Sequence, residues 1–195
     1  TVSPAGGNLK EPVTESTKKA ARCFYALEQN RADQKRYPAV NPIDSYSKYL
    51  EYPEIREFLD AKIEKGWAEK VNRAKNIIRQ GRDASEQINI LGDDGVPMSY
   101  HETFWKSELL DFVFLQQDAF DAVDSLCPLD RQKYMMNLIL GICDRSFSFE
   151  NFEECRNFFK EMINDLRQMN YTEFHSEAFE KYNSQLSKLL EENGK

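Results

Sequence analysis

The chain has 195 residues, which is enough to bury a sizeable core in one domain or a small two-domain unit without disulfide or metal staples. Acidic residues outnumber basic ones by 33 to 26, and the formal net charge is -7. This balance argues against binding to nucleic acids or to anionic membrane surfaces, which requires a basic patch. No run of about 18 apolar residues is present, so the sequence predicts no membrane span.

The N-terminal quarter is expected to be the least regular part, because five of the seven prolines lie in the first 53 residues. Residues 1–12 are expected to form a loop. A helix is expected after Pro12, with apolar residues at helical spacing up to Leu27 and an end before Pro38. The two prolines in residues 37–47 indicate an ordered connector rather than a helix or strand.

Residues 54–80 carry a continuous apolar stripe at spacings of three and four, which predicts one long helix. Its polar face includes Glu69 and Arg73, spaced as an i,i+4 ion pair. Gly81 is expected to end or loosen this helix. A short helix is expected around 84–91, followed by a loop over 92–97.

The second half of the chain predicts further helices. Ser99 and Glu102 have the spacing of a capping box, and Pro128 suits the first turn of the next helix. Two more stripes follow, from Phe152 to Met169 and from Phe174 to Leu189. Together these elements predict an all-α fold, a C-terminal helical bundle of roughly six or seven helices with an irregular, Pro-rich N-terminal segment.

The residues alone offer no catalytic centre, because P-loop, dinucleotide-binding, GxSxG and HExxH motifs are all absent. The four cysteines form no CxxC pair, and they are expected to be free thiols. His101 and His175 are expected to be ordinary surface or helix-end residues. These observations favour a helical interaction module. A stand-alone scaffold or adaptor, and a helical enzyme with a carboxylate or metal site, remain alternatives.

Two aromatic residues lie outside the helical stripes. Tyr37 belongs to the Pro-rich connector, and Phe120 follows the point at which a helical pattern breaks. An aromatic ring on an ordered, non-helical segment can pack at the end of an element, or it can stack on a planar ligand such as a nucleobase. The spacing does not distinguish these roles.

Three strings of sequence resemble one family. SPAGGNLKEPVT, RYPAVNPIDSYSKYL and FLQQDAFDAVDSLCPLDRQKYMM are similar to segments of the catalytic A subunit of V-type and archaeal-type rotary ATPases, in the family's order and at about its spacing. The resemblance covers essentially the whole chain. It implies that the chain is the C-terminal portion of such a subunit and that it begins just after the nucleotide-binding core. Residues 1–45 would then come from the edge of that core, and residues 46–195 would form the helical bundle domain.

The resemblance also implies a role for the two aromatic residues. The family's adenine pocket is formed by the aromatic of the Pro-containing segment and by the Phe of the QQxAF segment, which are Tyr37 and Phe120 here. ATP or ADP with Mg would bind to the intact subunit. No catalytic residue, metal ligand or cofactor is expected in this portion alone.

By the same resemblance, the expected partners are the non-catalytic B subunits and the central-stalk subunits of a cytoplasmic complex peripheral to the membrane. Neither nucleic-acid binding nor direct membrane insertion is expected. The bundle would couple the nucleotide state to rotation of the stalk, and thereby to ATP synthesis or hydrolysis and to transport of protons or sodium ions.

Overall fold

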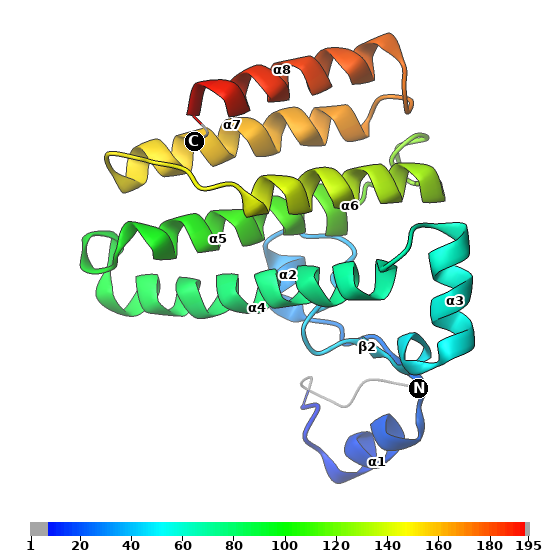
Figure 1. Ribbon diagram of the computed structural model, residues 1–195. Coiled ribbons are helices and arrows are strands. Elements are labelled where there is room, and N and C mark those ends of the chain that lie inside the picture. The colour runs from blue at the N-terminus through cyan, green and yellow to red at the C-terminus, as the bar shows by residue number, and fades with distance from the viewer. Residues whose placement is uncertain (1–7, 194–195) are drawn as a thin grey trace. The chain divides into compact units, whose positions relative to one another are not determined.

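The computed structural model describes residues 8–193 and contains two compact units, Thr1–Val71 and Asn72–Lys195. Helices dominate both units, which confirms the all-α prediction (Figure 1). The paired strands of the described part are short: β1 (Cys23–Phe24) runs antiparallel to β2 (Tyr46–Ser47). The expected domain boundary after residue 45 falls within the first unit and stays a prediction. The SPAGG letters of the first family-like string lie outside the described residues.

The first unit contains α1 (Pro12–Ala20), α2 (Gln29–Asp33), the 3-10 helix η2 (Lys48–Glu51) and α3 (Pro53–Lys62). The prediction of a single helix from Pro12 to the region before Pro38 is wrong. Phe24 lies in β1, and Leu27 forms an antiparallel bridge with Val40. Ala26 is buried while its neighbour Leu27 is exposed, which is the alternation of an extended chain rather than a helical face.

The long helix predicted over residues 54–80 is interrupted between α3 and α4 (Trp67–Leu91). The break is made by Gly66, whose φ of 82° lies in the left-handed region that favours glycine. The Asp60 carboxylate accepts a hydrogen bond of 3.0 Å from the Gly66 amide and holds this turn. The predicted Glu69–Arg73 pair is absent from the ion pairs of the described residues: Glu69 pairs with Arg56, and Arg73 pairs with Asp144.

Gly81 does not end α4, contrary to expectation, and the predicted short helix over 84–91 is a continuation of α4. The glycine is required by packing instead. A Cβ atom on Gly81 would lie 2.0 Å from Cβ of Ser107, which belongs to α5 (Met98–Leu110). The absence of a side chain therefore allows α4 and α5 to approach closely at this point.

The rest of the second unit comprises the 3-10 helix η3 (Asp93–Gly95), the π-helical turn η4 (Asp111–Leu115), α6 (Leu129–Asp144), α7 (Phe152–Asn170) and α8 (Glu177–Asn193). Helix α7 packs against both α5 and α8, so it lies inside the unit (Figure 1). Its inward face is fully predicted by the apolar stripe and consists of Cys155, Phe158, Phe159, Met162, Ile163, Leu166 and Met169.

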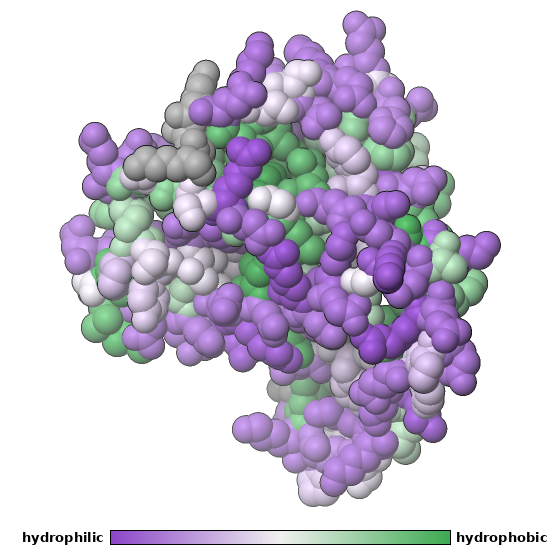
Figure 2. Space-filling view, in the orientation of Figure 1, coloured by the Kyte–Doolittle hydropathy of each residue, from purple (hydrophilic) through white to green (hydrophobic). Residues whose placement is uncertain are grey.

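The start of α5 differs from the predicted capping box. The helix begins at Met98 with Pro97 as its N-cap, and no side chain caps it. The Ser99 carbonyl instead accepts a hydrogen bond of 2.7 Å from the Thr103 hydroxyl. The face shown in Figure 2 is mostly hydrophilic with apolar side chains gathered in patches, as the modest apolar content and net charge of -7 lead one to expect. No helix in residues 8–193 is long and apolar enough to cross a membrane.

Candidate functional site

Phe120 lies in the loop 116–128, which joins η4 to α6. The loop begins at a fixed point. The Gln116 amide donates to the Asp111 carbonyl at 2.9 Å, which closes the π-helical turn. The Val113 carbonyl in this turn accepts a hydrogen bond of 2.8 Å from Nδ2 of Asn170, at the end of α7. Helix α7 therefore holds the chain in place immediately before the loop.

Within the loop, aspartate side chains accept hydrogen bonds from backbone N–H groups. Oδ1 of Asp118 accepts from Phe120 N at 2.9 Å. Oδ1 of Asp121 accepts from Val123 N and from Asp124 N, each at 2.8 Å. Such carboxylate-to-backbone bonds stabilise turns that the backbone alone would not hold. The loop is thus ordered by its own aspartates.

Asp124 closes the loop across its width. Its Oδ2 accepts from the Asp118 amide at 2.6 Å, and its carbonyl accepts from Nε2 of Gln117 at 2.6 Å. Burial raises the pKa of the Asp124 carboxyl, while the Asp118 amide and the charge of Arg131 oppose that shift. Because the carboxylate loses hydration on burial, these contacts and charges replace part of the water it gives up.

The Phe120 side chain itself is fully exposed, with a relative exposure of 101%. A large apolar side chain gains no burial in this position. The structure therefore presents an aromatic ring to the solvent on a loop whose backbone is fixed.

Tyr37 belongs to the first unit and lies just before a cis peptide bond to Pro38. The connector over residues 37–47 is held by hydrogen bonds, but its last two residues, Tyr46 and Ser47, form β2, so the expectation that it contains no strand is wrong. The Asn41 amide donates to the Ala26 carbonyl at 2.7 Å, and the Asn41 side-chain oxygen accepts from the amides of Ile43 and Asp44. The Tyr37 ring is half-exposed. Tyr37 and Phe120 thus lie in different units, each on a backbone that hydrogen bonds hold in place.

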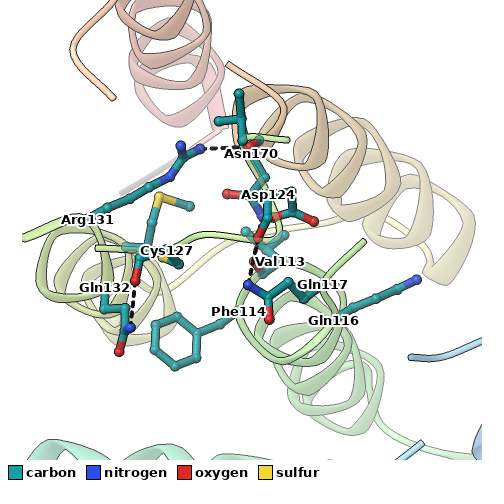
Figure 3. Close-up of a pocket in the computed structure, with 11 residues that line it drawn as sticks. Val113, Phe114, Gln116, Gln117, Asp124, Cys127, Arg131, Gln132 and Asn170 are labelled. Carbon is teal, nitrogen blue, oxygen red and sulfur yellow. Dashed lines mark hydrogen bonds between the residues drawn. The ribbon is translucent and has the colours of Figure 1, made fainter. Parts of the chain in front are cut away.

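A cavity of about 240 Å³ lies beside the Phe120 loop in the second unit (Figure 3). It is lined by residues from η4, the loop, the start of α6 and the end of α7. Most of its polar side chains donate to backbone carbonyls: Nε2 of Gln132, for example, donates to Cys127 at 2.8 Å. Burial raises the pKa of the Cys127 thiol. The lining residues are Val113, Phe114, Gln116, Gln117, Val123, Asp124, Cys127, Arg131, Gln132, Met135 and Asn170.

Sequence reasoning missed Arg131, which is only 3% exposed. Its guanidinium donates to the carbonyls of Met169, Asn170 and Thr172 at 2.8–3.0 Å. The carbonyls of Met169 and Asn170 belong to the end of α7, where the helix dipole favours a positive charge, and Thr172 follows shortly after the helix. One arginine in the first turn of a helix is too common a pattern to have indicated this role.

His101 also differs from the expectation, because it is buried rather than at the surface. Its ring stacks on Phe152 with ring centres 5.5 Å apart, and its Nε2 lies 2.9 Å from the Asp93 carbonyl. His175 is exposed, as expected, and pairs with Glu180. Among residues 8–193, no group of three or more His, Cys, Asp or Glu could hold a metal ion.

Residues 56–174 match the C-terminal domain of V and A type ATP synthase. The chain belongs to this family. The family membership confirms the resemblance found in the three strings, and it favours that hypothesis over a stand-alone scaffold.

The chain is 40% identical over 190 residues to the V-type ATP synthase alpha chain of Chlamydia caviae. It is 37% identical over 191 residues to that of Protochlamydia amoebophila. These alignments cover 97% and 98% of this chain but 32% of each relative, so the chain spans about a third of their length and corresponds to their C-terminal part.

A solved structure supports the fold. The chain resembles a unique ATP synthase subunit, NeqB, from Nanoarcheaum equitans, with a TM-score of 0.56 over 73% of this chain and 33% of that one. The identity is 15%, so this likeness concerns the fold alone.

Proposed function

We propose that this chain forms the last third of an ATP synthase alpha subunit and that Tyr37 and Phe120 contact the adenine ring of ATP or ADP. The observation that carries the proposal is the fully exposed Phe120 ring on a hydrogen-bonded loop. Stacking of a base on one aromatic side chain contributes about 1–3 kcal/mol. Stacking would remove water from the face of the base and from the face of the ring that meets it. It would therefore account for an aromatic side chain that is fully exposed in its own unit.

The phosphates and Mg²⁺ would be bound by the rest of the alpha subunit. The present chain has no P-loop motif and offers no metal-binding cluster within its described residues. The chain on its own should therefore not hydrolyse ATP, and any binding of ATP or AMP to it should be weak. Measurable Mg²⁺-dependent turnover by the pure chain would refute this division of roles.

The second unit would also transmit the nucleotide state to a central stalk. Helix α5 runs from the α4–α5 turn directly into η4, and η4 leads into the Phe120 loop. At the turn, Ile90 and Leu91 are exposed at the end of α4. Exposed apolar side chains at a helical hairpin favour a protein contact. We propose that central-stalk subunits press here and that B subunits flank the alpha subunit in a complex peripheral to the membrane.

Coupling of this kind has a thermodynamic condition. A nucleotide can drive the movement of packed helices only if it binds one of their arrangements more tightly than another. An adenine contact on the Phe120 loop meets this condition when the position of the loop depends on the position of α5. Rotation of the stalk, ATP turnover and the movement of protons or sodium ions would then be linked through the same helix.

The experiment uses an alpha subunit that carries this chain and measures its affinity for ATP. Tyr37→Ala and Phe120→Ala should each weaken ATP binding about 5- to 150-fold, which corresponds to the loss of one stacking contact. Tyr49→Ala and Tyr100→Ala, which remove exposed aromatic rings elsewhere in the same two units, serve as matched controls. Unchanged affinity in the first two variants would remove both residues from the binding site.

A further inference from the structure

The backbone of its loop sets the point from which the Phe120 side chain projects, since the exposed ring gains no burial of its own. An aromatic side chain stacks well on a base only at a defined angle and distance. If its loop is mobile, the entropy lost when the loop becomes ordered offsets part of the stacking energy. A residue that holds the loop therefore contributes to binding through the ring.

Asp124 is the residue through which the two sides of the loop are joined. Its Oδ2 binds the Asp118 amide, and Asp118 in turn binds the Phe120 amide through Oδ1. The Asp124 carbonyl binds the side chain of Gln117. Phe120 is thus connected to Asp124 by two successive hydrogen bonds. Figure 3 shows Asp124 in the middle of the cavity lining, above Gln117 and facing Arg131.

The Asp124 carboxylate forms no ion pair within the described residues, although Arg131 lines the same cavity. The guanidinium of Arg131 is instead directed to the carbonyls that end α7. A half-buried carboxylate without an ion-pair partner destabilises the fold, because burial removes water from its charge. The same loss of water raises the pKa of the Asp124 carboxyl. The Asp124 carboxylate instead accepts a hydrogen bond from the Asp118 amide.

We propose that Asp124 is a positioning residue for purine nucleotides, fixing the loop so that the Phe120 ring meets the base. The inference rests on the proposed function of Phe120. The positioning role requires a hydrogen-bond acceptor in place of Oδ2 of Asp124. It does not require a negative charge, because the donor is the backbone N–H of Asp118. Asparagine at this position keeps an acceptor oxygen of the same reach, whereas alanine removes it.

The first test uses the chain itself and measures hydrogen exchange of the Asp118 and Phe120 amides. Asp124→Ala should speed exchange of both amides at least about tenfold, since each loses protection when the bond network opens. Asp124→Asn should leave their exchange near the wild-type rate. Asp83→Ala and Asp83→Asn are matched controls, because Asp83 is exposed on α4. Unchanged exchange in Asp124→Ala would overturn the positioning role.

The second test uses an alpha subunit that carries this chain and compares kcat/KM for ATP and CTP. A purine presents the larger face to the Phe120 ring, so Asp124→Ala should reduce the preference for ATP several-fold through KM, with kcat retained. Asp124→Asn should restore the preference. An equal loss for both nucleotides would indicate a merely structural role and would overturn the proposal.

Phe120→Ala in the same assay separates the two proposals. If Phe120→Ala lowers the ATP preference and Asp124→Ala does not, the positioning role fails and the role of Phe120 stands. If Phe120→Ala leaves the preference unchanged, the proposed function fails, and the inference about Asp124 fails with it. Should Asp124→Ala not fold, Asp124→Ser, whose hydroxyl is too short to reach the Asp118 amide, replaces it in both tests with the same expectations.

Discussion

Replacement of Gly81 by alanine should destabilise the second unit, although Gly81 lies inside a helix. The added Cβ would lie 2.0 Å from Cβ and 2.2 Å from Oγ of Ser107. Carbon atoms do not approach closer than about 3.0 Å without displacement, so α4 and α5 must separate by about 1 Å. Overpacking of this kind costs about 1–3 kcal/mol, and the better helix propensity of alanine returns up to about 1 kcal/mol. We expect a net loss of about 1 kcal/mol, or roughly 2–4 °C in Tm.

Two further variants make this expectation specific. Ser107→Gly combined with Gly81→Ala leaves the Ser107 Cα as the nearest remaining atom at 3.5 Å, an ordinary contact, and should recover most of the loss. Gly141→Ala lies in α6 with nothing within 4 Å and should be neutral or stabilising by up to about 1 kcal/mol. Thermal and urea denaturation measure all three variants. The close approach of α4 and α5 would be refuted if Gly81→Ala were as stable as Gly141→Ala.

Three other predictions concern buried groups. Arg131→Ala should lower the free energy of unfolding by about 3 kcal/mol, measured by urea denaturation, because the carbonyls that end α7 lose their charged donor. Because burial raises the pKa of Cys143 to about 11 and of Cys155 to about 12, both should resist alkylation at pH 7–9 until the chain unfolds, as mass spectrometry would show. Burial raises the pKa of Asp124 in the folded chain, so Asp124→Asn should be more stable than wild type at pH 7. This gain should shrink as the pH falls through the raised pKa toward the ordinary value of 3.8, and it should be absent below that value.

The helices of the second unit could be predicted because each buries one long apolar face. The stripe of α7, from Phe152 to Met169, coincides with the helix and with its buried residues. A helix that buries one face must repeat its apolar residues every three or four positions. This repeat differs from the two-residue alternation of a strand, so it predicts a helix.

The errors arise where a single residue or a distant contact decides the structure. The apolar stripe continues across the break at Gly66, because Ile63 and Trp67 keep the helical spacing through a turn that glycine permits. Gly81 does not end its helix, because the glycine is required by Ser107, which lies against it in the fold but 26 residues away in the sequence. His101 is buried because Phe152, about fifty residues later, covers its ring. These contacts are tertiary and leave no local pattern.

The candidate site was predicted only in part. The sequence placed Tyr37 and Phe120 on non-helical segments, and the structure confirms that both segments are ordered. The aspartates that order the Phe120 loop were not predicted as a set. Their carboxylates accept from amides up to six residues away, so the network depends on the folded path of the loop. Whether the two rings share one base stays a prediction.

The most direct test of that prediction is photolabelling of an alpha subunit carrying this chain with an azido-adenine nucleotide, followed by peptide mapping. If the adenine ring lies against both aromatic residues, the label should appear on the peptides that contain Tyr37 and Phe120, and excess ATP should prevent it. Label confined to other peptides, with these two unmodified, would contradict the adenine contact.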